Sequence, residues 1–330
     1  MPVAPSSHNL SLIGHEAAFQ QAVDAIASGR LHHAWLLTGI EGIGKATLAR
    51  QIATHVLIGG DGAVRPSATS GRAERLIAAD SHPDLLTLRR ATDDKTGETR
   101  KVIVVDEALK VGAFLRRTAT HGGWRVVVVD EADALNRHAQ NAVLKILEEP
   151  PARALILMTA TRPGALLPTI RSRCRVLQLS PLTDAQIKVI LARSAEALAT
   201  DMVDNLTTLS GGSAGFALKI LRSEVLPLYA ELVAVIEAPA SLDVARLHKL
   251  ADQISRKADA ESYETLTILL LDRLQKVVRA FALDGRDQVH VDRKVQLWVR
   301  VRDLFALAEG ANLDRKLAFV NAVMDIRNAS

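Results

Sequence analysis

A glycine-rich stretch near the start of the chain has the spacing of a phosphate-binding loop. It reads Gly39-Ile-Glu-Gly42-Ile-Gly44-Lys45-Ala46-Thr47 and stands between an apolar run, 34–38, and a segment with helical periodicity. Glycines let backbone N–H groups turn inward around phosphate oxygens, and the lysine reaches the β- and γ-phosphates. We therefore expect a nucleotide, ATP or ADP, to be held by residues of this stretch: Gly39, Gly42, Gly44, Lys45 and Thr47.

One position departs from this motif. The residue after the lysine is normally Ser or Thr, whose hydroxyl binds Mg²⁺, and here it is Ala46. Thr47 is adjacent in sequence but points about 100° away around the helix. The sequence thus permits nucleotide binding and disfavours magnesium-dependent hydrolysis.

Two apolar runs end in Asp-Glu, the pair that would complete such a site. Residues 102–105 precede Asp106-Glu107, and residues 126–129 precede Asp130-Glu131. The Asp would bind Mg²⁺ and the Glu would polarise the attacking water, at the carboxyl edge of a parallel sheet. Only one pair can serve, and Asp106 is better suited to capping the helix that follows. We favour Asp130 as the magnesium and nucleotide ligand and Glu131 as the water-activating base.

The elements that must position these residues alternate between strand and helix. Strands are predicted at 34–38, 102–105, 126–129, 154–160 and 176–179, with helices over 48–56, 107–120 and 133–149 between them. This order predicts a mostly parallel α/β sheet. After Pro181 the β-branched runs stop, and helices are expected at 184–197, 200–209, 215–222 and throughout 226–330. We predict three parts: an α/β domain (1–180), a helical lid (181–224) and a C-terminal helical domain (225–330).

The composition and the charge pattern exclude several classes of protein. The 330 residues include one cysteine, Cys174, which excludes an internal disulfide and a multi-cysteine zinc site. No apolar run approaches the ~20 residues of a membrane span. Residues 1–8 lack the basic start and apolar core of a signal peptide, so we expect a cytoplasmic protein. The net charge of +4 is mild, and over residues 271–330 both signs are interspersed, which disfavours a dedicated DNA-binding domain.

Three longer segments carry a resemblance. They are Asp130-Glu-Ala-Asp-Ala-Leu-Asn136, Asn141-Ala-Val-Leu-Lys-Ile-Leu-Glu-Glu-Pro-Pro151 and Ser172-Arg173-Cys174. Together they resemble the clamp-loader branch of the AAA+ ATPases. In that family the arginine of Ser-Arg-Cys reaches the γ-phosphate held by a neighbouring subunit, which implies that Arg173 is an arginine finger in trans. A planar guanidinium suits this contact because it can bind phosphate oxygens bidentately.

Further segments are similar to the delta-prime subunits of the bacterial DNA polymerase III clamp loader. These are Gly14-His-Glu16, His33-Ala-Trp35, His82-Pro-Asp84 and Asn312-Leu-Asp-Arg-Lys316. The resemblance implies a stator that assembles with motor ATPase subunits and a clamp-opening subunit, loads the sliding clamp onto primed DNA, and uses its C-terminal domain as an oligomerising collar. Motor subunits carry a lid arginine in a Gly-Ser-x-Arg pattern, and Gly215 takes its place here. Many relatives have a four-cysteine zinc module, absent from residues 57–82, so zinc is not expected.

Two other functions stay open. An active motor-type ATPase is favoured by Lys45, Asp130 and Glu131 and opposed by Ala46 and Gly215. A stand-alone DNA-binding protein is opposed by the interspersed charges of the C-terminal region.

Overall fold

The computed structural model describes residues 12–59, 67–92, 99–120, 123–194, 198–223, 225–238, 243–255, 260–284, 288–310 and 314–329. Residues 1–8, part of the 57–82 segment and residues 312–313, from which expectations were drawn, lie outside these ranges. The chain separates into two compact units, Met1–Gly215 and Phe216–Ser330. The three-part division at 180 and 224 stays a prediction.

The N-terminal unit contains a parallel sheet of five strands. These are β1 (Ala34–Thr38), β2 (Leu85–Leu88), β3 (Arg125–Val129), β4 (Ala154–Ala160) and β5 (Arg175–Gln178). Their order is β2-β3-β4-β1-β5, and every neighbouring pair is parallel. All residues of β1, β3 and β4 are buried, as expected for central strands covered on both faces. The predicted parallel α/β sheet is confirmed.

One predicted strand is wrong. Residues 102–105 form no strand: Ile103 makes an isolated bridge to Leu135, and helix α4 (Val105–Leu115) has already begun at Val105. Asp106 and Glu107 occupy the first turn of that helix, where carboxylates are favoured by the helix dipole. The edge position of the sheet belongs instead to β2, a short strand between Pro83 and Arg89-Arg90 that was not predicted.

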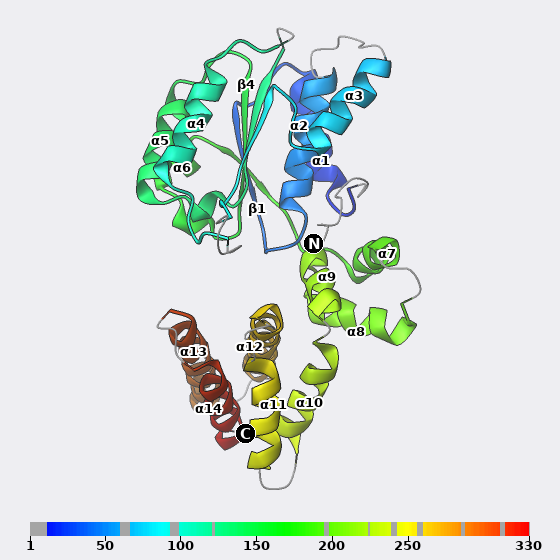
Figure 1. Cartoon of the computed structure of the whole chain (residues 1–330), viewed down its shortest axis with the longest axis vertical. Coiled ribbons are helices and arrows are strands. Elements are labelled where there is room, and N and C mark those ends of the chain that lie inside the picture. The colour runs from blue at the N-terminus through cyan, green and yellow to red at the C-terminus, as the bar shows by residue number, and fades with distance from the viewer. Residues whose placement is uncertain are drawn as a thin grey trace. The chain divides into compact units, whose positions relative to one another are not determined.

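Helices cover both faces of the sheet (Figure 1). On one face lie α1 (Glu16–Ala27), α2 (Lys45–Gly59) and α3 (Ser67–Ala78), and on the other lie α4, α5 (Arg137–Glu148) and α6 (Pro168–Arg171). A hydrophobic core lies on each face of the sheet, and successive strand residues point into one core or the other. Trp35 packs toward α2, and Leu36 packs toward α4 and α5. Short 3₁₀ turns, Ala132–Ala134 and Pro163–Ala165, follow β3 and β4.

Three helices follow β5: α7 (Asp184–Ser194), α8 (Thr200–Ser210) and α9 (Ala214–Ser223). Residues 212–215, which we call the lid turn, connect α8 to α9 and still belong to the N-terminal unit. This places the start of α9 in the unit that carries the phosphate loop.

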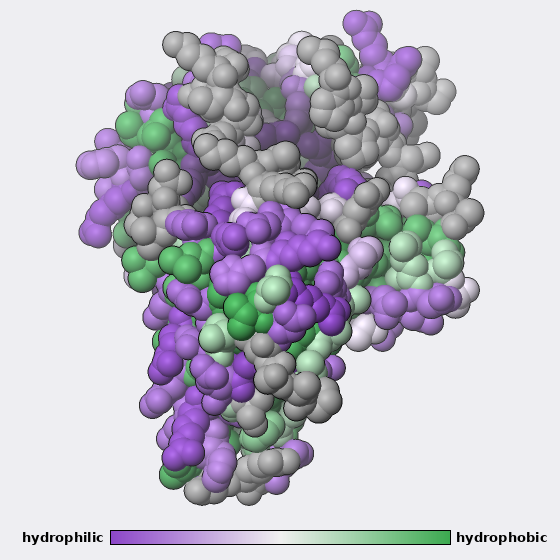
Figure 2. Space-filling model, turned by 60° about the horizontal axis from the view of Figure 1, so that its bottom comes forward, coloured by the Kyte–Doolittle hydropathy of each residue, from purple (hydrophilic) through white to green (hydrophobic). Residues whose placement is uncertain are grey.

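The C-terminal unit is helical, as predicted. It contains α10 (Leu226–Glu237), α11 (Val244–Ser255), α12 (Ala260–Leu283), α13 (Gln288–Gly310) and α14 (Arg315–Asn328). Its core includes an aromatic cluster of Tyr263, Phe305 and Phe319, with ring centroids 6.0–6.3 Å apart. Most of the surface visible in Figure 2 is hydrophilic, and hydrophobic residues gather there only in small patches. No helix in the described ranges is both long and apolar enough to span a bilayer.

Candidate functional site

The glycine-rich loop connects the carboxyl end of β1 to the first turn of α2. Gly39, Gly42 and Gly44 have φ values of 151°, 74° and 105°, a region that other residues rarely adopt. A Cβ on Gly39 would also lie 2.9 Å from the carbonyl oxygen of Leu179. The loop therefore needs its glycines for its own conformation, as a phosphate-binding loop does.

Every carbonyl oxygen of the loop accepts a hydrogen bond. The donors and distances are Lys45 Nζ to Gly39 (2.9 Å) and Ile40 (2.8 Å), Ser213 Oγ to Glu41 (2.8 Å), Gly215 N to Gly42 (2.8 Å), His15 Nε2 to Ile43 (2.7 Å) and Leu48 N to Gly44 (2.9 Å). None of these bonds uses an N–H group of the loop. The loop is thus fixed through its carbonyl oxygens, an arrangement compatible with N–H groups that bind the phosphate half of a nucleotide.

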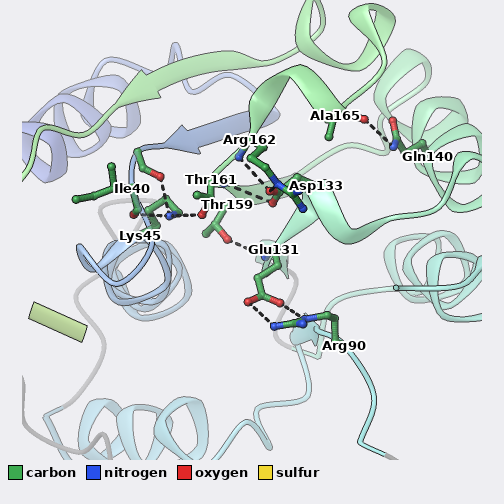
Figure 3. Close-up of polar contacts among 11 residues, drawn as sticks. Ile40, Lys45, Arg90, Glu131, Asp133, Gln140, Thr159, Thr161, Arg162 and Ala165 are labelled. Carbon is green, nitrogen blue, oxygen red and sulfur yellow. Dashed lines mark hydrogen bonds and ion pairs between the residues drawn. The ribbon is translucent and has the colours of Figure 1, made fainter. Parts of the chain in front are cut away.

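Lys45 ties the loop to the end of β4. Its ammonium group also donates to Thr161 Oγ1 at 2.9 Å, as Figure 3 shows. The side chain is buried, and burial lowers the pKa of Lys45, while the carboxylates of Asp133, Glu41, Asp130 and Glu131 oppose that shift. A phosphate that binds Lys45 must replace these oxygen partners.

The metal half of the site is incomplete. Ala46 offers no oxygen, Thr47 is half-buried in the same helical turn, and Asp130 Oδ1 already accepts from Thr159 Oγ1 at 2.7 Å. A cavity of about 60 Å³ lies between Ala46 and Asp130 and is also lined by Arg50 and Arg89. Both guanidinium groups pair with Asp80, so Asp130 is the one carboxylate among the described residues that lines the cavity, and one carboxylate without a hydroxyl beside it is a poor set of ligands for Mg²⁺. The residues fit Mg²⁺ poorly.

Glu131 is held by an arginine. Its backbone is left-handed, with φ 57°, and both of its carboxylate oxygens accept hydrogen bonds from Arg90, the Nη2 to Oε1 distance being 2.9 Å. This hydrogen bonding to Glu131 raises the pKa of Arg90. Both oxygens of the Glu131 carboxylate are thus occupied by the Arg90 guanidinium in a bidentate pair. Its role as the water-activating base stays a prediction, and that role requires Arg90 to move away.

Asp133 holds the segment after β4. Its nearly buried carboxylate accepts from the backbone N–H groups of Thr161 (3.4 Å) and Arg162 (3.0 Å), and Arg162 also forms an ion pair with it. Figure 3 shows these contacts beside Lys45 and Glu131. The rejected alternative, Asp106-Glu107, contributes nothing to this cluster, since Glu107 pairs with Lys110 on the surface of α4.

Several residues of this cluster were missed in the sequence. They are His15, Arg90, Asp133, Thr159 and Thr161. Thr159 and Thr161 had a readable signal, because they are polar residues at the carboxyl end of an otherwise apolar run. Arg90 had none, since β2 itself was not identified.

The lid turn lies directly on the loop. The Gly215 N–H bonds the Gly42 carbonyl, and a Cβ on Gly215 would lie 2.7 Å from the Gly42 Cα. The position predicted to have lost a lid arginine therefore has no space for any side chain in this arrangement.

Arg173 lies at the end of the sheet where the strands begin, whereas the phosphate loop lies where the strands end. Arg173 lies two residues before the start of β5. Its Nη2 pairs at 3.0 Å with Oε1 of Glu148, at the end of α5, after which the chain continues to the start of β4. Its Nη1 donates to the Thr169 carbonyl at 3.1 Å, and its side chain is 38% exposed. Since all strands are parallel, Arg173 is at their amino ends and the phosphate loop is at their carboxyl ends.

Cys174, the neighbour of Arg173, packs against the sheet core. Its Sγ contacts the Ile170 carbonyl at 3.1 Å, and burial raises the pKa of the thiol to about 12. A thiol in this protonated form is a packing group without nucleophilic reactivity.

Comparisons with known proteins identify the family. Residues 14–183 match the family described as DNA polymerase III, delta subunit. The chain is 35% identical over 260 residues to DNA polymerase III subunit delta' of Pseudomonas aeruginosa, which covers 77% of this chain and 73% of that protein. It is 32% identical over 206 residues to subunit delta' of Escherichia coli K12 (62% and 59% covered), and 31% identical over 177 residues to subunit tau of Salmonella typhimurium (54% and 26%). The chain belongs to the delta-prime subunits of DNA polymerase III.

Proposed function

We propose that this chain is a stator subunit of the DNA polymerase III clamp loader, which places the sliding clamp on primed DNA. Its neighbours would be motor ATPase subunits and a clamp-opening subunit, and it would meet the clamp and DNA through the assembly. Its contribution to chemistry would be Arg173, donated to the γ-phosphate of ATP in an adjacent motor subunit.

The position of Arg173 carries this proposal. Because the guanidinium lies at the amino edge of the sheet, it is remote from the chain's own phosphate loop at the carboxyl edge. It is partly exposed, and its carboxylate partner, Glu148, is 44% exposed. Solvent-exposed pairs of this kind are weak, so a phosphate on a neighbouring subunit can displace Glu148.

The chain's own loop supports nucleotide binding without efficient turnover. The loop has the left-handed glycine conformations that a phosphate-binding loop requires, and its carbonyl oxygens are bonded to other groups of the chain. Ala46 lacks the metal-binding hydroxyl, and the Glu131 carboxylate is occupied by Arg90. ATP or ADP would therefore stabilise the subunit, while hydrolysis takes place in its neighbours.

The direct test is a reconstituted loader in which the other motor sites are inactivated at their phosphate-loop lysines. DNA-stimulated ATPase then reports the single site that faces this chain. Arg173→Ala should lower turnover at that site by about 10³-fold or more, the usual contribution of an arginine supplied in trans. The matched control is Arg171→Ala, two residues away, whose guanidinium turns inward to the Pro163 carbonyl. Equal turnover in both variants would refute the finger assignment.

The preformed phosphate cradle favours a second candidate, an active motor-type ATPase. Purified chain should then hydrolyse ATP, and Glu131→Gln should abolish the turnover while leaving binding intact. The stand-alone DNA-binding alternative predicts tight binding of primed DNA by the isolated chain, measured by fluorescence anisotropy. We expect neither.

A further inference from the structure

A cavity of about 480 Å³ opens within the C-terminal unit, remote in sequence from the phosphate loop and from Arg173. It lies among the end of α10 and the helices α12, α13 and α14. Its volume is in the range of about 300–1,000 Å³ typical of sites that take a small ligand or a peptide anchor. All of its lining residues fall within the described ranges and belong to this one unit.

The floor of the cavity is aliphatic. Leu270, Leu274, Leu297 and Ile326 are each at least nine-tenths buried and line it together with Val277. These side chains come from three different helices, so the floor is fixed by the packing of the unit itself. Such a floor favours a bulky apolar group and offers it no hydrogen bond.

The rim of the cavity is basic. Three cationic side chains line it, Arg273, Lys294 and Arg327, against one carboxylate, Glu237. Arg273 pairs with Glu237, and Lys294 donates to the Ala329 carbonyl at 2.6 Å. Arg327 donates to the Val235 and Ile236 carbonyls at 3.3 Å, near the end of α10, which holds its charge in place. The surplus of two positive charges favours an anionic partner.

The mixture of groups on this rim selects the kind of partner. A peptide brings carboxylates for Arg273 and Lys294 and also N–H donors for Glu237. Single-stranded nucleic acid depends on aromatic side chains for stacking, and none lines this cavity in the part of the chain that the structure describes. A fatty acid offers one carboxylate to a rim that has a surplus of two positive charges. An acidic peptide with an apolar anchor satisfies both the floor and the rim.

We propose that this cavity, which we call the collar pocket, binds an acidic peptide segment of a partner protein, with one bulky apolar side chain on the aliphatic floor and flanking carboxylates on Arg273 and Lys294. The site is distinct from the phosphate loop and from Arg173. It would give the subunit a second means of recruiting a protein, independent of nucleotide.

The test uses the full chain and a fluorescein-labelled peptide, Glu-Asp-Leu-Phe-Asp-Glu, followed by fluorescence anisotropy. Two matched peptides replace Leu-Phe by Ser-Ser, or every acidic residue by its amide. Lys294→Glu is the pocket variant. Lys276→Glu is its control, because Lys276 is an exposed lysine on α12 paired with Asp272 and lies outside the lining. Thermal melts of both variants verify that each is folded. If Lys294→Glu is not folded, Lys294→Ala is used in its place.

We expect the acidic, apolar peptide to bind and both altered peptides to bind at least about tenfold more weakly, as for a lost charge-assisted contact or a lost anchor. Lys294→Glu should weaken binding by about tenfold or more, and Lys276→Glu by less than about twofold. The proposal is wrong if no binding occurs up to about 1 mM peptide. It is equally wrong if Ser-Ser replacement or Lys294→Glu has no effect, or if an oligothymidylate shows the Lys294 dependence and the peptide does not.

Discussion

Replacing Gly215 by alanine should separate the lid turn from the phosphate loop. The added Cβ would lie 2.7 Å from the Gly42 Cα and 3.1 Å from the Gly42 oxygen, both backbone atoms of a constrained loop. Ordinary contact needs at least 3.4 Å. The lid turn must therefore retreat by about 0.7 Å, which stretches the Gly215 N to Gly42 O bond from 2.8 Å to the outer limit of a hydrogen bond.

The free energy of unfolding should fall by about 1 kcal/mol, the middle of a range of about 0–2.5 kcal/mol. Two hydrogen bonds are affected, Gly215 to Gly42 and Ser213 to Glu41, each contributing about 0.5–1.5 kcal/mol. Alanine has a better helix propensity than glycine in the first turn of α9, and this offsets about 0.5–1 kcal/mol of the loss in the free energy of unfolding. For a unit of this size the midpoint temperature should fall by about 2–4 °C.

Tryptophan fluorescence can follow this unit alone. Of the three tryptophans, Trp35 and Trp124 belong to the N-terminal unit, so a Trp298→Phe background reports its unfolding without a signal from the helical unit. Gly71→Ala is the matched control, because Gly71 lies within α3 and an added Cβ would meet no atom within 4 Å. That substitution should stabilise the protein by about 0.5–1 kcal/mol.

The two substitutions are thus expected to change stability in opposite directions. If Gly215→Ala stabilised the unit as Gly71→Ala does, the lid turn would not rest on the loop. Steric exclusion by Gly42 would then be refuted as the reason why the lid arginine is missing. Hydrogen–deuterium exchange of peptides covering residues 39–48 should show the same contrast, with faster exchange only in the Gly215 variant.

Three further changes have defined outcomes. Ala46→Ser restores a hydroxyl at the metal position, and it should raise affinity for ADP several-fold in Mg²⁺ but leave it unchanged in EDTA, measured by calorimetry. Burial lowers the pKa of His33, so the unfolded chain binds a proton there more readily than the folded chain. The free energy of unfolding should therefore decrease as the pH falls below about 6.5. His33→Gln should reduce that decrease, measured by thermal melts between pH 7.5 and 5. Glu148→Gln removes the partner of Arg173 and should raise turnover at the neighbouring ATPase site up to about fivefold at low salt, with the gain lost at high salt.

Most of the sheet was predictable because its central strands are continuous, mainly apolar runs that are buried along their whole length. The error at 102–105 arose because this segment has the same apolar pattern. Ile103 is buried but Val102 is 45% exposed, and Ile103 makes only an isolated bridge to Leu135. The edge strand β2 escaped notice because only Leu85 and Leu88 are fully buried and charged residues follow at once. Short edge strands give weak sequence signals for this reason.

The site was predictable where residues adjacent in sequence cooperate, as in the loop and the Asp130-Glu131 pair. It was not predictable where partners are distant in the chain. Arg90 and Glu131 are 41 residues apart, and nothing in either segment indicates the other. Similarly, the family resemblance implies an arginine at the position of Gly215, and only the structure shows that a Cβ there would lie 2.7 Å from the Gly42 Cα.

The ties that hold the phosphate loop also bear on what its sequence motif indicates. Lys45 joins two loop carbonyls to Thr161, so that replacing it would loosen the fold even in a subunit that never hydrolyses ATP. This requirement of the fold holds whether or not the chain itself hydrolyses ATP. The glycines and the lysine of its loop are therefore not, by themselves, a sign of an active ATPase, because the folded loop needs them in either case.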